Sequence, residues 1–151
     1  MNIEILAVDK VRKPYLREAC GVYVKRLGPL VPVTITEIRP AVSTDNISVE
    51  AKRILDRVDD ESLLWALDAS GRQLSSVALA AKIDAAQRSG KRRLALVIGG
   101  DRGLGEAVRV RADFVWSLSQ LTFLHEMARF IVLEQLYRAV KINRGEPYHR
   151  G

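Results

Sequence analysis

The stretch LALVIGGDRGLG, residues 94–105, joins a short apolar run to a loop that contains four glycines. The run LALVI at 94–98 is typical of a strand that is covered on both faces. LLWAL at 63–67 has the same character, and FVWSL at 114–118 predicts another such strand. A helix is predicted over about 76–88 between the first two of these strands in the chain. Strands that alternate with helices predict an α/β fold with a largely parallel sheet flanked by helices.

The first third of the chain fits the same architecture. IEILAV at 3–8 and VTITEI at 33–38 predict two further strands. Pro14 suits the first turn of a helix between them. Thr44 or Asp45 can cap a second helix, whose apolar residues recur at helical spacing. The apolar face of that helix is formed by Ile47, Ala51, Ile54, Leu55 and Val58.

Length and composition indicate one domain, residues 1–151, with 48% apolar and 28% charged residues. Apolar runs stay shorter than the roughly 18 residues of a membrane helix, and the N-terminus lacks a signal-peptide pattern. We therefore expect a cytoplasmic protein without a membrane partner. The single cysteine, Cys20, excludes an internal disulfide. With only two histidines beside it, the usual Cys/His zinc sites cannot form, so we expect no metal.

The chain is basic, with 24 Lys and Arg against 18 Asp and Glu, a net charge of +6 and a pI near 9.8. Such a balance favours polyanionic partners. Many of the cations lie in the last third of the chain, which predicts that phosphates are bound there. They are Arg102, Arg109, Arg111, Arg129, Arg138, Lys141, Arg144 and Arg150.

A final helix is predicted over about 126–142, and its residues 130–133 are all apolar. A helix with apolar residues in nearly every direction must be covered on more than one side. Two arrangements satisfy this requirement. Either a partner subunit covers one side, or the helix lies centrally in the core of a single chain.

The glycines of the loop after 94–98 allow a sharp turn and close approach of a ligand to main-chain amides. Their spacing fits neither GxGxxG nor the P-loop, because Glu106 stands where the P-loop has lysine. Nucleotide hydrolysis and a standard dinucleotide fold are therefore disfavoured. Ligands of parallel sheets bind beyond the carboxyl ends of strands, here 68–71, 99–105 and 117–123. A purely structural turn is the alternative.

The C-terminal tail, NRGEPYHRG at 143–151, combines Arg144, Tyr148, His149 and Arg150 in seven residues. Two cations, an aromatic ring and an imidazole suit an RNA phosphate and a splayed base. The segment SLSQLTFLHEMAR before the last helix is less specific. By itself it reads as the exit of a strand and the start of a helix.

Four motifs together resemble one known family. They are LDASG at 67–71, LVIGGDRGLG at 96–105, SLSQLTFLHEMAR at 117–129 and LEQLYRAVKINRGEPYHRG at 133–151. Over essentially its whole length the chain resembles the ribosomal RNA large subunit methyltransferase H family of the SPOUT superfamily. The resemblance implies a C-terminal trefoil knot, a homodimer and S-adenosylmethionine as cofactor. It also implies methylation at N3 of a pseudouridine in helix 69 of 23S ribosomal RNA, within the assembled ribosome.

Carried over position by position, the cofactor contacts of that family fall on the three strand ends named above. The resemblance assigns them to Leu67, Gly99, Leu118, Ser119, Gln120, Leu121, Thr122 and Phe123. Two positions depart from the commonest form of the family. Leu124 stands where proline usually precedes the histidine, and the pair Asp101-Arg102 occupies a variable position. We expect Leu124 to loosen the turn beside the cofactor.

The implied reaction needs the N3 proton of an imide to leave, because the protonated nitrogen is not nucleophilic. We assign proton handling to His149, stabilisation of the anion to Arg138, and stacking or orientation of the base to Tyr148. Arg144 and Arg150 are assigned to RNA phosphates. A phosphate contact is also the alternative for His149 and Arg138. We expect the tail to complete the pocket of the partner subunit.

Two other functions remain open from the sequence. The first is a non-catalytic ribosome- or RNA-binding module without a cofactor. The second is a SPOUT methyltransferase that acts on tRNA.

Overall fold

The computed structural model describes residues 1–42 and 45–151. In this part of the chain five parallel strands form one sheet in the order β2-β1-β4-β3-β5. The strands are β1 Asn2–Val8, β2 Val33–Ile38, β3 Leu63–Gln73, β4 Arg93–Ile98 and β5 Phe114–Ser117. The helices are α1 Pro14–Leu27, α2 Asn46–Leu55, α3 Ser76–Arg88, α4 Glu106–Arg111 and α5 His125–Asn143. The predicted α/β architecture with a parallel sheet flanked by helices is confirmed.

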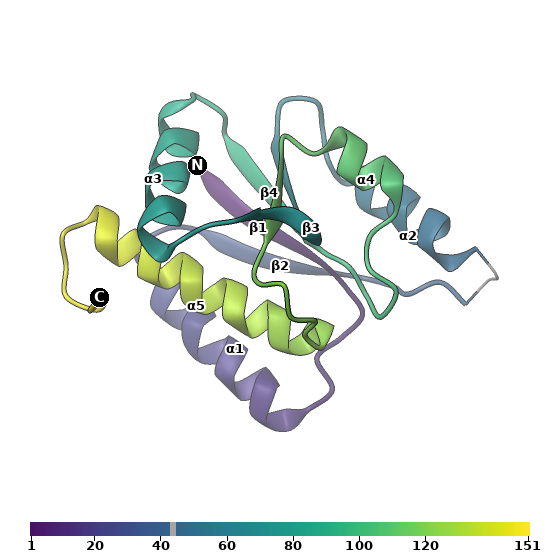
Figure 1. Ribbon diagram of the computed structural model, residues 1–151, viewed down its shortest axis with the longest axis horizontal. Coiled ribbons are helices and arrows are strands. Elements are labelled where there is room, and N and C mark those ends of the chain that lie inside the picture. The colour runs from purple at the N-terminus through teal and green to yellow at the C-terminus, as the bar shows by residue number, and fades with distance from the viewer. Residues whose placement is uncertain (43–44) are drawn as a thin grey trace.

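The helices cover the two faces of the sheet as separate layers (Figure 1). On one face, Ile3 and Ile5 of β1 pack in a cluster with residues of α1, α3 and α5. On the other face, Leu6 and Val8 pack with residues of α2 and α4. This alternation follows from the two-residue period of a strand. The central strand β4 is apolar because both of its faces are buried, and Leu94–Ile98 are at most 3% exposed.

Two elements differ from the sequence-based expectation. The structure contains α4, a six-residue helix that is too short to show a clear apolar period. Strand β3 continues past Leu67 to Gln73, because Leu67 and Arg72 both pair with Trp116 and the residues between them bulge out. A bulge hides the alternation on which a strand prediction depends.

The capping prediction for α2 is confirmed for Asp45, whose carboxylate accepts a hydrogen bond of 3.4 Å from the backbone N–H of Ser48. The alternative cap, Thr44, lies outside the described residues. The helix ends at Leu55, so Val58 lies beyond it, although its side chain still packs against the core on this face.

Helix α5 lies between α1 and α3 and packs against the sheet (Figure 1). Val132, Leu133 and Leu136 have no exposed surface within one chain. The position of α5 in the core of one chain therefore explains why most sides of this helix are apolar. Phe130 and Ile131 are half-buried and leave a narrower face that a partner could cover. The homodimer and the trefoil knot stay predictions.

The described helices include none with both the length and the apolar character to cross a bilayer. Cys20 is buried in α1, as expected of a small core side chain, and burial raises the pKa of its thiol.

Candidate functional site

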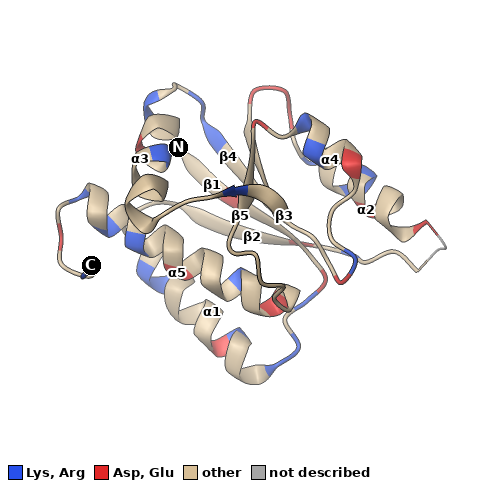
Figure 2. Ribbon diagram, viewed as in Figure 1, with Lys and Arg blue, Asp and Glu red and all other residues tan. Residues whose placement is uncertain are grey.

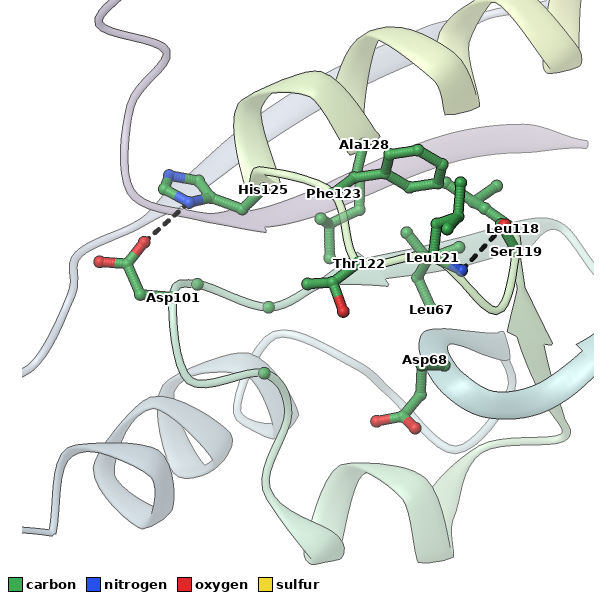
Figure 3. Close-up of a pocket in the computed structure, with 15 residues that line it drawn as sticks. Leu67, Asp68, Asp101, Leu118, Ser119, Leu121, Thr122, Phe123, His125 and Ala128 are labelled. Carbon is green, nitrogen blue, oxygen red and sulfur yellow. Dashed lines mark hydrogen bonds and ion pairs between the residues drawn. The ribbon is translucent and has the colours of Figure 1, made fainter.

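A pocket of about 250 Å3 lies where the carboxyl ends of β3, β4 and β5 meet the first turn of α5 (Figure 3). Parallel strands present their carboxyl ends at one edge of a sheet, so the loops that follow them converge. Segments that are far apart in the sequence thereby form one cavity. It is lined by Leu67, Asp68, Ala69, Ile98, Gly99, Gly100, Asp101, Gly103, Leu118, Ser119, Leu121, Thr122, Phe123, His125 and Ala128.

The structure brings together seven of the eight residues that the resemblance assigns to the cofactor. They are Leu67, Gly99, Leu118, Ser119, Leu121, Thr122 and Phe123. Gln120 is not among the residues that line the pocket. The contact of these residues with a cofactor stays a prediction, but their position around one cavity is a structural fact.

Several lining residues were not assigned from the sequence. Asp68, Gly100 and Asp101 belong to the segments 68–71 and 99–105, which the strand-end rule marked for ligand binding without assigning these residues individually. His125 reads only as a helix start, and Ala128 belongs to the apolar face of α5. For Ala128 there was no signal, because an alanine that faces a cavity and one that faces the core look alike in sequence.

The loop after β4 folds back on itself. The backbone N–H of Gly103 donates a 3.0 Å hydrogen bond to the carbonyl of Gly100, and Gly103 has a φ of +79°. A Cβ on Gly99 would lie 2.6 Å from the carbonyl carbon of Gly103. We expected Gly99 to make room for a ligand, but the structure shows that it first makes room for the loop's own backbone.

The connection from β5 to α5 forms the opposite wall. Its turn is held by Ser119, whose Oγ accepts a 3.0 Å hydrogen bond from the backbone N–H of Leu121 (Figure 3). Leu118 and Phe123 pack against the core, whereas Leu121 is 70% exposed at the mouth. Leu124 has φ −56° and ψ 140°, and this φ also suits proline. Leu124 therefore introduces no backbone strain.

Carboxylates stand at the mouth of the pocket. Asp68 accepts hydrogen bonds from the backbone N–H and hydroxyl of Ser70, at 2.9 and 2.6 Å, and lies 3.4 Å from the Arg109 guanidinium. Burial raises the pKa of Asp68, but these hydrogen bonds and the cation outweigh it, so the pKa lies below its usual value. Across the cavity, Asp101 lies 3.0 Å from Nδ1 of His125 (Figure 3).

The residues assigned to catalysis form a separate cluster around Glu134. Arg138 donates to the Glu134 carboxylate through Nε and Nη2, at 3.1 and 2.5 Å. The hydroxyl of Tyr148 donates to the same oxygen at 3.0 Å and lies 2.8 Å from the hydroxyl of Tyr23. Because an arginine can only donate, Nδ1 of His149 accepts the 3.2 Å hydrogen bond from Arg138 Nη1. The cluster thus ties the tail to α5 and α1.

The cluster changes the protonation of its members. Burial, followed by hydrogen bonding with Tyr23 and Glu134, raises the pKa of Tyr148 far above its usual value. The hydrogen bond with Glu134 raises the pKa of Arg138. The Arg138 guanidinium also lies 4.8 Å from the centroid of the Tyr148 ring. Tyr148 is therefore a neutral phenol with one contact to a cation already made.

The pocket adjoins the N-terminal end of α5, whereas this cluster lies in the C-terminal half of α5 and in the tail that follows. From His125 to Arg138 the helix rises about 20 Å, at about 1.5 Å per residue. The structure therefore does not bring the proposed catalytic residues to the pocket within one chain. Arg144 and Arg150 are exposed near the C-terminus, and Arg144 Nε donates to Glu146 at 2.7 Å.

Most cations of the last third are already paired with carboxylates of the same chain. Arg111, Arg138, Lys141 and Arg144 each form an ion pair, and so does Arg109 with Asp68. Arg129 is 4% exposed and holds Glu37 at 2.8 Å. These ion pairs reduce the free positive charge of the region, because paired charges attract anions weakly, and the expectation that it binds phosphates stays a prediction. Of the expected cations, the ion pairs of the described residues include neither Arg102 nor Arg150.

Comparisons with known proteins agree with the fold. The family described as "Predicted SPOUT methyltransferase" matches residues 1–149. Proteins named ribosomal RNA large subunit methyltransferase H from Bifidobacterium adolescentis and Acetivibrio thermocellus are each 41% identical, over 99% of this chain and all of theirs. A solved structure from Haemophilus influenzae, described as a probable methylase family protein, has a TM-score of 0.59. At 16% identity it covers 99% of this chain and 71% of its own, which supports the fold alone.

Proposed function

Because the chain belongs to the SPOUT methyltransferase family, we propose that it methylates the ribosomal RNA of the large subunit, with S-adenosylmethionine as donor. The finer assignment is N3 of a pseudouridine in helix 69 of 23S ribosomal RNA, in the assembled ribosome. One observation carries the proposal. Seven of the eight residues assigned to the cofactor, from three distant segments, surround a single pocket at the carboxyl edge of the sheet.

The pocket fits the proposed cofactor in chemistry. Leu67, Ile98 and Leu118 offer apolar surface for an adenine ring, and the carboxylates of Asp68 and Asp101 suit a cationic sulfonium and ammonium. The cofactor supplies an activated methyl group when bound. The chain's part is to align the acceptor and exclude water. In the β5–α5 connection, Leu118 and Phe123 pack against the core and supply an apolar wall on that side of the pocket.

We propose that the working enzyme is a homodimer in which the tail of one subunit completes the pocket of the other. The pocket alone, at about 250 Å3, is smaller than the roughly 300–1,000 Å3 typical of small-molecule sites. The tail cluster is too far along α5 to complete it in the same chain. A second copy of the cluster, supplied by the partner, can provide both the missing wall and the missing cations.

Within that composite site Arg138 of α5 and the residues of the tail each have a role. Arg138 stabilises the negative charge that develops on the imide. While Nδ1 of His149 accepts from Arg138, the neutral imidazole carries its proton on Nε2. When Arg138 turns to the RNA, Nδ1 becomes free to accept the N3 proton. Tyr148, whose single O–H is donated to Glu134, offers its ring to stack on or orient the base, and Arg144 and Arg150 contact phosphates.

The test of this function has two steps. Calorimetry first measures binding of S-adenosylmethionine, and a protein that binds none would be an RNA-binding module instead. The protein is then incubated with methyl-labelled cofactor and assembled ribosomes, free 23S ribosomal RNA or tRNA. We expect label in the ribosome, and a new reverse-transcription stop in helix 69, because N3 methylation blocks the pairing edge of the base. Label in tRNA alone would establish the tRNA alternative.

A further inference from the structure

Two hollows flank β2, which is one of the two edge strands of the sheet. One has a volume of about 510 Å3 and is lined by residues of α1, β2 and α5. The other has a volume of about 560 Å3 and is lined by the end of β2 and by α2. Because α1 and α2 cover opposite faces of the sheet, the hollows lie on opposite sides of this edge. They share Glu37, which joins them into one continuous surface that we call the β2 edge track.

The β2 edge track is strongly basic. The α1 side is lined by Lys10, Arg17, Lys25 and Arg129. The α2 side is lined by Arg39, Arg53 and Arg57.

Among the described residues two carboxylates line the track, and both are already paired. Glu37 lies 2.8 Å from Arg129, and Asp56 lies 3.0 Å from Lys52. Within residues 1–42 and 45–151, the side chains of Lys10, Lys25, Arg39 and Arg57 are exposed and take part in no hydrogen bond or ion pair. The first two stand before and on α1, where Figure 2 shows blue segments. Free, exposed cations are what the phosphates of a nucleic acid require.

The track leads to the cofactor pocket. A third hollow, of about 260 Å3, lies at the carboxyl ends of β1 and β2. It shares Gly100, Asp101 and His125 with the cofactor pocket, and at its other side it includes Pro40, which follows Arg39 in the chain. A ligand that lies along the β2 edge therefore continues over the ends of the central strands toward the place where the methyl donor is expected.

We propose that the β2 edge track binds the backbone phosphates of the RNA that flanks the methylated nucleotide. This inference rests on the proposed function for its partner, but it assigns the grip on RNA to the first third of the chain. Neutralisation of phosphates by lysine and arginine releases condensed counterions, which makes the binding sensitive to salt. Charged residues along an edge strand also prevent pairing with other sheets, and the test separates that explanation from RNA binding.

The test removes three charges from the track and three from another surface. The track variant combines Lys25→Gln, Arg39→Gln and Arg57→Gln. The matched control combines Arg88→Gln, Lys91→Gln and Arg92→Gln, which change the net charge equally. Arg88 is the last residue of α3, and Lys91 and Arg92 precede β4, away from the carboxyl edge of the sheet. Because Arg88 and Lys91 are ion-paired with Asp84 and Glu61, the control tests the loss of net charge, whereas the track variant tests the loss of free cations.

Binding to ribosomes is measured over a range of salt concentrations with S-adenosylhomocysteine, so that no methyl transfer is needed. For the track variant we expect the salt slope to fall by about 2, at roughly 0.7 per lost phosphate contact, and the affinity to fall tenfold or more. KM for the ribosome should rise with kcat and cofactor affinity unchanged. The control should behave as the wild type.

The outcomes separate the inference from the proposed function. If the track variant and the control bind with equal affinity and slope, the inference is overturned, even where methyl transfer to ribosomal RNA succeeds. The same holds if the track variant binds normally but self-associates, because the charges then only guard the edge. If no RNA is methylated but the track variant alone loses ribosome binding, the docking surface stands and the proposed reaction fails.

Discussion

The two ends of α5 are built in different ways. At its N-terminal end the pocket is shaped by backbone: strand ends, a loop with a left-handed glycine, and a turn held by Ser119. At its C-terminal end the cluster is shaped by charged and phenolic side chains around Glu134. A backbone-built site tolerates few substitutions without losing its shape. A site built by side chains can lose one function at a time, so the two ends should respond to mutation in different ways.

The largest effect is expected from a substitution in the glycine-rich loop that shapes the pocket. In Gly99→Val the Cβ would meet the backbone of Gly103 at 2.6 Å, so the loop must move and cofactor binding should become undetectable. Gly21→Val in α1 is the matched control, since no atom lies within 4 Å of a Cβ at that position. Calorimetry with S-adenosylmethionine checks both variants. Equal affinity in Gly99→Val and the wild type would disprove the role of this loop.

The second largest effect is expected from removal of the C-terminal tail, which contributes side chains to the cluster. Deletion of 144–151 should leave cofactor binding nearly intact, because the pocket residues remain, while methyl transfer to ribosomes falls by orders of magnitude. The deletion chain is then co-expressed with Thr122→Trp, in which an exposed pocket side chain is enlarged to block the cavity. Each chain alone should be inactive, whereas the mixed dimer should regain activity at one site. A mixed dimer without activity would show that each tail serves its own pocket.

A smaller loss should follow from Arg138→Lys. Lysine keeps the positive charge but cannot reproduce the fork that holds Glu134 and His149 together. We expect kcat to fall by roughly 10²- to 10⁴-fold, the range typical of one acid-base group, with cofactor affinity unchanged. Lys141→Arg, one turn away and also paired with a carboxylate, is the control and should stay within a few-fold of wild type. A kcat equal to that of this control would remove Arg138 from the mechanism.

The pH dependence of stability tests the role of Tyr148 in the cluster at the C-terminal end of α5. Because the pKa of Tyr148 is raised on folding, its contribution to stability is present below the unfolded pKa of about 10 and is lost as pH rises above it. Tyr148→Phe should cost about 1–2 kcal/mol at neutral pH, through the lost hydrogen bonds. Its stability should also decline less between neutral pH and pH about 11 than that of the wild type. Urea unfolding at several pH values checks this, and parallel pH curves would contradict it.

The smallest expected effect concerns Leu124, the residue directly before α5. Its φ of −56° already suits proline, and its backbone N–H donates no hydrogen bond among the described residues. Leu124→Pro should therefore raise the free energy of unfolding by about 0.4–1 kcal/mol through the entropy of the unfolded chain. Thermal unfolding measures it, with Leu121→Ala at the exposed mouth as control. Destabilisation would mean that the turn needs a different backbone conformation.

Much of the fold could be predicted because its signals are local. Apolar runs such as 94–98 mark strands that are buried on both faces, and helical spacing with a cap marks α2. The elements that were missed lack such signals: α4 is too short to show a period, and the bulge in β3 interrupts one. Within the pocket, the strand-end rule and the resemblance located most of the lining, whereas His125 and Ala128 became visible only when α5 was placed.

The sequence by itself determined most of the strands and helices and the glycine-rich loop, because backbone conformation depends mainly on residues that are near in the chain. It did not determine which charges are free. Arg129 looked like a phosphate ligand, yet tertiary structure buries it against Glu37, which is 92 residues away. Lys25 and Arg57 were not predicted to bind phosphates, yet they are exposed beside the edge strand β2. The partner of a charged side chain comes from a distant segment, and so only the folded chain decides whether that charge remains available to a ligand.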